Sequence, residues 1–70
     1  MRKYLVIYEP NDEGAWCAYT PDIDGVVAVM DTREEAEEAM RIGISMYLDG
    51  LRERGEPLPE PRNIAGYVAA

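Results

Sequence analysis

Short runs of apolar residues alternate with polar, turn-forming segments along the chain, and this pattern predicts four strands. Residues 3–8 (KYLVIY), 15–20 (AWCAYT) and 26–30 (VVAVM) are rich in β-branched and aromatic side chains, and residues 64–68 (IAGYV) resemble them. Runs of this length and composition are typical of strands. The two polar stretches that separate the first three runs contain Gly, Pro, Asn and Asp, so they predict a hairpin loop and a turn.

One long helix is predicted over residues 33–54. Thr32 and Glu35 have the spacing of a capping box, which marks the start of a helix. Gly55 is a plausible end, and Gly50 leaves an earlier end open because glycine disfavours a helix interior. The proline-rich residues 56–61 predict an extended connector.

These elements predict the α+β fold class in the order β-β-β-α-β. We expect a small, mainly antiparallel sheet with one helix packed on one face, formed as a single domain over residues 1–70. No DNA-binding domain is expected in addition, since the predicted elements occupy the whole sequence.

The predicted helix has an apolar face and a polar face. At 100° per residue the core side consists of Ala36, Met40, Gly43, Ile44, Tyr47 and Leu51. Gly43, at the centre, allows the helix to approach the strands closely. The opposite face carries Glu34, Glu38, Arg41, Ser45, Asp49 and Arg52, which we interpret as a solvated surface. One flank, formed by Ala39, Ile42 and Met46, is either part of a wide core or a contact with a second subunit.

Both faces of the predicted sheet are apolar, although one helix covers only one of them. Residues 4–8 and 26–30 contain no polar position that alternates with the apolar ones, apart from tyrosine hydroxyls. A half-solvated sheet normally alternates apolar and polar residues. We therefore expect a homodimer or a higher homo-oligomer. The alternative is that the tyrosines and Trp16 tolerate partial exposure by keeping their polar tips in water.

The charge of the chain excludes one class of partner and favours another. The formal net charge is −7, with 14 acidic and seven basic residues. Direct nucleic-acid binding requires a basic face, so it is not expected, whereas a basic protein partner would be attracted. No apolar run approaches the roughly 20 residues of a membrane span, and no export signal precedes the first strand. With a single cysteine, these features indicate a cytoplasmic protein.

Reactive groups are scarce, so we expect no enzyme, no metal and no cofactor. The sequence contains no His and a single cysteine, Cys17, which provides neither a nucleophile–base pair nor a metal-binding CxxC motif. Asp22 and Asp24 share a turn, where carboxylates usually bond their own backbone, and a divalent cation needs more oxygen ligands than these two.

In order and spacing, several segments resemble the HicB-like antitoxin family. These are the opening strand followed by Glu9-Pro10, the turn 21–25 (PDIDG), the helix start 31–36 (DTREEA), and residues 48–51 (LDGL) with the proline-rich segment 56–61. Asp24 and Met30 depart from the pattern, which usually has Pro and often Gly there.

The resemblance implies a truncated ribonuclease-H-like fold and an antitoxin that binds and occludes a basic, mRNA-cleaving toxin of the HicA type. Catalysis of the ribonuclease-H kind is not implied, because residues 5–7 place no carboxylate within the first strand. A stand-alone homo-oligomeric binding or scaffold domain with the same fold is the alternative.

We expect acidic side chains to attract the toxin and aromatic side chains to anchor it. The candidate partner-binding residues are Glu9, Asp12, Glu13, Trp16, Tyr19, Asp22 and Asp24. Trp16 is equally suited to the core.

Overall fold

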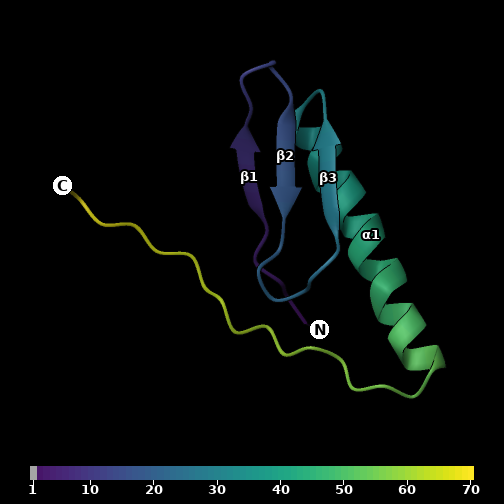
Figure 1. Ribbon diagram of the computed structural model, residues 1–70. Helices are drawn as coiled ribbons and strands as arrows, with labels where there is room; N and C mark the ends of the chain where they lie inside the picture. Colours follow the sequence, from purple (N-terminus) through teal and green to yellow (C-terminus); the bar gives the residue numbers. More distant parts are fainter. Residues whose placement is uncertain (1) are drawn as a thin grey trace.

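A computed structural model describes residues 2–70 as three strands followed by one helix (Figure 1). The strands are β1 (Ile7–Pro10), β2 (Trp16–Tyr19) and β3 (Val27–Met30), and the helix is α1 (Arg33–Glu53). The sheet is antiparallel in the order β1-β2-β3, and α1 packs against it. The predicted α+β class, the first three strands and the helix are therefore confirmed.

The strands are shorter than predicted because β2 provides only four paired positions. Tyr8 pairs with Ala18, and Ala18 pairs with Ala28, at the centre of the sheet. Residues 3–6 lie beyond the paired region of β1, since the chain turns away after Tyr19.

Asn11 organises the loop between β1 and β2. Its Oδ1 atom accepts hydrogen bonds from the backbone N–H groups of Glu13 and Ala15, both at 2.9 Å. Gly14 follows with φ of 84°, a conformation that favours glycine. Because Asn11 closes the loop so tightly, Glu9 and Pro10 belong to β1 and not to the predicted loop.

The start of α1 has the predicted capping box. Thr32 Oγ1 accepts from the backbone N–H of Glu35 at 3.0 Å, and the Glu35 carboxylate accepts from the backbone N–H of Thr32 at 3.1 Å. The helix continues through Gly50, so the earlier end is wrong, and Gly55 follows its C-terminus with φ of 69°.

Small residues line the contact between α1 and the sheet. Ala18, Ala28 and Ala36 form one buried cluster with Met40. Gly43 lies directly over Val26, because a Cβ atom built on Gly43 would be 3.1 Å from Val26 Cγ1. The predicted close approach at Gly43 is confirmed.

A second buried cluster covers the lower half of α1 and corrects one predicted core position. Ile23, Leu48 and Leu51 are buried together, with Leu58 packed against them. Tyr47, predicted in the core, is 37% exposed. Here the helix extends past the short strands and packs on the β2–β3 turn and the connector, which turns its buried face from Tyr47 towards Leu48.

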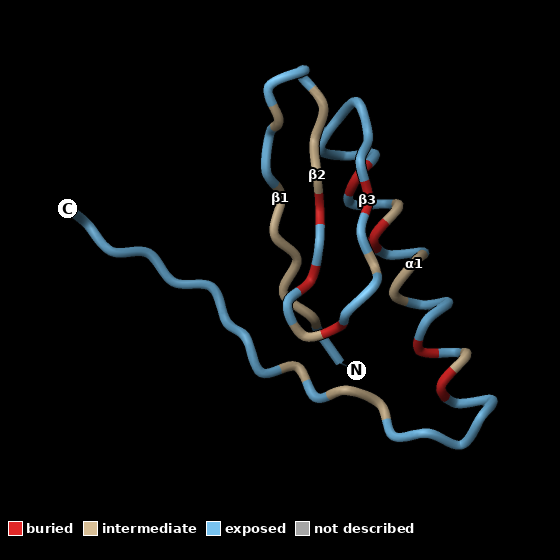
Figure 2. Tube along the Cα trace, in the orientation of Figure 1, coloured by how far each residue is buried: buried red, intermediate tan, exposed pale blue. Residues whose placement is uncertain are grey.

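The predicted fourth strand over residues 64–68 is wrong. Residues 56–70 follow an extended path that forms no strand (Figures 1 and 2). The connector before this segment is held at the lower end of the sheet: the Tyr4 hydroxyl donates to the Pro59 carbonyl at 2.6 Å, and Arg2 pairs with Glu60 at 3.5 Å. Beyond Asn63 the chain is not hydrogen-bonded to β1, so no ladder forms.

The close approach at Gly43 predicts an asymmetry between the two helix glycines. We expect Gly43→Leu to reduce the free energy of unfolding by about 1–3 kcal/mol, because the side chain would collide with Val26 beneath it. Gly50→Leu is the matched control. There an added Cβ meets only the flexible end of Arg54, and helix propensity favours the change by up to about 0.8 kcal/mol. Chemical denaturation measures the free energy of unfolding of both variants. Equal changes at the two positions would contradict the close packing of Gly43 on Val26.

Candidate functional site

Negative charge is concentrated at one end of the molecule. The β1–β2 loop and the start of α1 lie at this end (Figure 1). We define the acidic end by the acidic residues at the end of β1, in the β1–β2 loop, and just before and within the first turn of α1, which are Glu9, Asp12, Glu13, Asp31, Glu34 and Glu35. All of them are exposed, and the only basic residue among them is Arg33.

Arg33 is held against the sheet and does not project freely from the acidic end. Its guanidinium lies 4.7 Å from the centre of the Tyr8 ring, a cation–π distance. Partial burial, together with the nearby Glu37 carboxylate, raises the pKa of the Tyr8 hydroxyl, while Arg33 lowers it. Tyr8 is therefore neutral over the physiological range, and the positive charge of Arg33 is directed towards the aromatic ring.

The opposite end of the molecule is close to electrical balance. It contains the β2–β3 turn, the end of α1 and the connector (Figure 1). The charged residues of these segments and of the N-terminal segment are Arg2, Lys3, Asp22, Asp24, Asp49, Arg52, Glu53, Arg54, Glu56, Glu60 and Arg62. Several are paired, as Arg52 is with Asp49 at 2.9 Å. The charge asymmetry therefore distinguishes the acidic end from the rest of the surface.

The structure separates the predicted partner-binding residues into different groups. Glu9, Asp12 and Glu13 lie together at the acidic end, whereas Asp22 and Asp24 lie in the turn at the opposite end. Asp22 is already engaged, because its carboxylate accepts from the Asn63 side chain at 2.6 Å and from the Asn63 backbone N–H at 3.3 Å.

The two predicted aromatic anchors point to opposite sides of the sheet. Trp16 is half-buried and packs against the cluster of Ala18, Ala28, Ala36 and Met40, on the helix side. Tyr19 is 36% exposed and occupies the other side, since side chains alternate along a strand and Ala18 beside it faces the helix. Trp16 therefore has a core contact as well as exposed surface, whereas Tyr19 lies on the side of the sheet away from the helix.

The face of the sheet away from α1 is uncovered and apolar. We call it the open face and define it by two rows of paired residues, which are Ile7, Tyr19 and Val27, then Glu9, Cys17 and Val29. Val27 is 72% exposed and Val29 is 61% exposed. Cys17 is half-buried on this face. The expectation that a single helix leaves apolar sheet surface exposed is confirmed for β2 and β3.

The predicted oligomer-contact residues on the flank of α1 differ in exposure. Ala39 packs against the core, whereas Ile42 is 46% exposed and Met46 is 69% exposed. The wide-core interpretation holds for Ala39 only. Ile42 and Met46 are free to contact another molecule.

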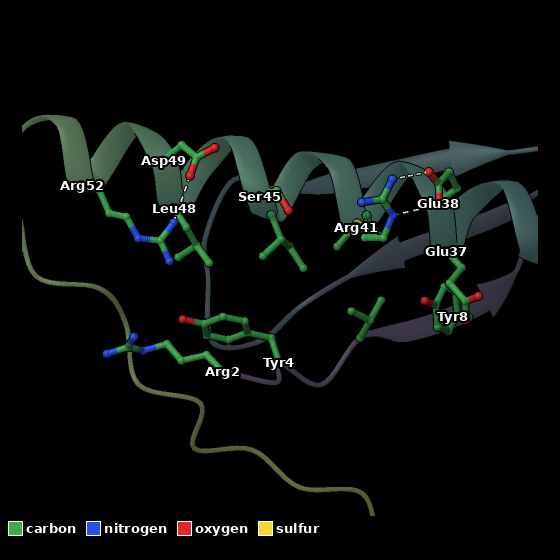
Figure 3. A pocket seen from close by; sticks show the side chains of 13 residues that line it. Arg2, Tyr4, Tyr8, Glu37, Glu38, Arg41, Ser45, Leu48, Asp49 and Arg52 are labelled. Carbon is green, nitrogen blue, oxygen red and sulfur yellow. Dashed lines mark hydrogen bonds and ion pairs between the residues drawn. The ribbon is translucent and has the colours of Figure 1, made fainter.

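A groove of about 740 Å³ lies between α1 and the part of the chain around β1 (Figure 3). Tyr4, Val6 and Tyr8 form one wall, and helix residues form the other. Along the helix wall, Arg41 bonds the Glu38 carboxylate at 3.0 and 2.5 Å, and the two charges stabilise each other. The Arg41 hydrogen bond, and its positive charge, lower the pKa of Glu38, while the same bond raises that of Arg41.

Sequence reasoning missed this groove and also missed Asn11. The predicted solvated face of the helix forms the rim of the groove because α1 lies over β2 and β3 and leaves the helix side of β1 uncovered. The spacing of Glu38 and Arg41, three residues apart, is the signal that was present in the sequence. For Asn11, the signal was its place before Gly14 in a tight loop.

The groove and the rest of the described surface offer binding contacts and no evident reaction. Its polar side chains are mostly paired charges, with Ser45 as its one hydroxyl other than the tyrosines. Within residues 2–70, no group of three or more His, Cys, Asp or Glu side chains is placed to hold a metal ion. No helix in this range is long and apolar enough to cross a membrane.

Comparison with known proteins gives one match. Residues 4–70 match the family described as HicB_like antitoxin of bacterial toxin-antitoxin system, so the match covers nearly the whole chain. No curated protein and no solved structure matches.

The contact between Asp22 and Asn63 predicts a pH-dependent attachment of the connector. Desolvation raises the pKa of the Asp22 carboxyl, but the hydrogen bonds from Asn63, together with the backbone hydrogen bond and the positive charge of Arg62, outweigh it, so the net pKa is lowered. The attachment is therefore fully present above the ordinary aspartate pKa of about 4 and is lost as pH falls through the lower, folded value. NMR shifts of the Asn63 amide groups should report this transition.

Asn63→Ala is the direct control for this transition, because it removes the side-chain hydrogen bond to Asp22 and leaves the backbone N–H of residue 63 in place. In this variant the Asp22 carboxyl should titrate at a higher pH than in the unmodified chain, because the side-chain hydrogen bond that lowers its pKa is gone. An Asp22 titration that is identical in both proteins would show that the contact is not formed in solution.

Proposed function

Because the chain belongs to the HicB-like antitoxin family of bacterial toxin–antitoxin systems, we propose that it binds and occludes a HicA-type, mRNA-cleaving toxin. This family consists of antitoxins that are not enzymes. The proposed action is therefore steric: the chain covers the surface with which the toxin binds or cleaves RNA, and it acts in the cytoplasm, where mRNA is found.

The acidic end is the observation that carries this proposal. A toxin that binds RNA requires a basic surface to neutralise phosphates. The acidic end presents carboxylates from the β1–β2 loop and from the start of α1, with Arg33 turned towards Tyr8. Complementary charge accelerates association and orients the partners. We therefore place Glu9, Asp12 and Glu13 in the toxin contact.

The aromatic residues extend the proposed contact from the acidic end onto the sheet. Trp16 lies at the end of β2 nearest the acidic end and retains exposed surface. Tyr19 is further along the open face, beside Val27. Large aromatic side chains of this kind commonly anchor interfaces. Asp22 and Asp24 lie at the far end, so they would take part only if the toxin spans the length of the sheet.

A homo-oligomeric binding or scaffold domain is the second candidate, and the open face is the observation that favours it. Val27 and Val29 are more than half exposed there, and Ile42 and Met46 are exposed on the helix flank. Apolar patches of this kind mark interaction surfaces. Self-association and toxin binding are compatible if they use different surfaces.

The direct test uses a purified HicA-type toxin, which is to be sought in the reading frames next to that of this chain. Purified together, the two proteins should form a complex, and RNA cleavage by the toxin should fall in proportion to the added chain until the two are equimolar. Cleavage that continues undiminished in the presence of excess chain would refute the antitoxin role.

Charge neutralisation localises the contact. We expect Glu9→Gln with Glu13→Gln to slow association with the toxin by about 3- to 10-fold at low salt, since electrostatic steering depends on charge near the contact. The difference should shrink as salt shortens the screening length to about 8 Å. Stopped-flow fluorescence of Trp16 measures the rate.

Asp24→Asn with Glu53→Gln is the matched control, because it removes the same charge at the opposite end of the molecule. Association of this variant should stay within about twofold of the unmodified chain at the same salt concentration. Equal slowing by the two variants would show that net charge, and not the acidic end, attracts the toxin.

A further inference from the structure

Residues 64–70 expose apolar side chains and an unpaired backbone. Ile64, Tyr67 and Val68 are 89%, 98% and 93% exposed. Across the described residues, no backbone hydrogen bond involves this segment. Three large apolar side chains within five residues are costly to leave in water. The composition of residues 64–68 also favours a strand, which requires a neighbouring strand for its hydrogen bonds.

The outer edge of β1 offers the complementary surface. In the sheet order β1-β2-β3, β1 pairs only with β2, so its other side has no strand beside it. An unpaired edge of this kind is a template for a further strand. Pro10 ends the usable edge, because proline has no N–H to donate, so the available stretch is residues 7–9 of β1 together with residues 5 and 6, which precede the strand.

The chain does not bring its own residues 64–68 onto this edge. Contacts at Pro59, Glu60 and Asn63 hold the connector at the lower end of the sheet. Beyond that point an open space of about 550 Å³ separates residues 64–67 from residues 5–8, which include the first half of β1. Figure 1 shows the final segment directed away from the sheet. Within one molecule, therefore, neither residues 64–68 nor the outer edge of β1 has a neighbouring strand with which to form backbone hydrogen bonds.

We propose that residues 64–68 of one copy of this chain pair, as a fourth strand, with the outer β1 edge of a second copy, and that the exchange is reciprocal. In each copy, residues 64–68 then gain a strand to pair with, and the outer edge of β1 gains a neighbouring strand. The arrangement is symmetric, as in domain-swapped dimers. The acidic end lies away from the anchored connector, so this proposal does not depend on toxin binding.

The chemistry of the two segments is compatible on both faces. Leu5 and Ile7 alternate with Val6 and Tyr8 along the edge, and Ile64 and Val68 alternate with Tyr67 along the segment. Both segments are therefore apolar on either side of the backbone. Glu9 is the one charged side chain in the two segments, and residues 64–68 carry none, so pairing them brings no like charges together, although each copy has a net charge of −7.

The test uses the fact that alternate N–H groups of an added strand point to the partner. One variant is Ala65→Pro with Tyr67→Pro, and the other is Gly66→Pro with Val68→Pro. Proline removes N–H donors, and only one of the two pairs directs its donors towards β1. We expect that pair to raise the dimer dissociation constant by roughly 10- to 30-fold more than the other. Sedimentation of the full chain against concentration measures the constant.

The substituted residues are exposed and have no backbone partners within the chain, so the variants should fold as the unmodified chain does. Circular dichroism and thermal unfolding at concentrations below dimer formation check this. If both double-proline variants raise the dimer dissociation constant equally, or if neither raises it, strand pairing would be overturned. An unmodified chain that remains at the 7.9 kDa monomer mass at every concentration would overturn the dimer.

Amide hydrogen exchange distinguishes exchange between copies from closure within one chain. In the proposed dimer, amides of residues 64–68 become protected only as concentration rises and the dimer forms. Protection that is already complete in the monomer would mean that the segment pairs with its own β1, which would overturn the proposal.

Discussion

The close packing of α1 on β2 and β3 is the contact on which the rest of the structure depends. It is made by small side chains, Ala18, Ala28 and Ala36, with Met40 as the one large side chain that is fully buried. Gly43 brings the helix backbone close to Val26. A core this thin covers one face of two strands. The groove beside β1, the open face and the free edge of β1 are all consequences of that limited coverage.

The proline-rich connector extends the core where the strands are too short to do so. Leu58 packs against Ile23, Leu48 and Leu51, and polar contacts of Tyr4 and Asp22 hold the chain on either side. This arrangement covers the lower half of the helix without another strand. It also fixes the direction in which residues 64–70 leave the molecule, and thereby leaves their apolar side chains in solvent.

The proposed function depends on how charge is distributed over this fold. The helix begins at the capping box of Thr32. Acidic residues are favoured in the first turn that follows, because they interact with the positive end of the helix dipole. The antiparallel hairpin places Asp12 and Glu13 at the same end. Local helix chemistry and sheet topology thus combine to create one acidic surface on an antitoxin-family domain, which is the surface that suits a basic, RNA-binding toxin.

The sequence by itself determined the features that depend on neighbouring residues. The capping box, the end of the helix at Gly55, the three strands and the family resemblance were readable because each is encoded within a short segment or in the order of such segments. Tertiary structure decided what depends on distant contacts. Leu48 replaced Tyr47 in the core, Asp22 bound Asn63 41 positions away, and residues 64–68 had strand composition but no adjacent edge with which to pair. A strand requires a partner in space, and composition alone does not provide one.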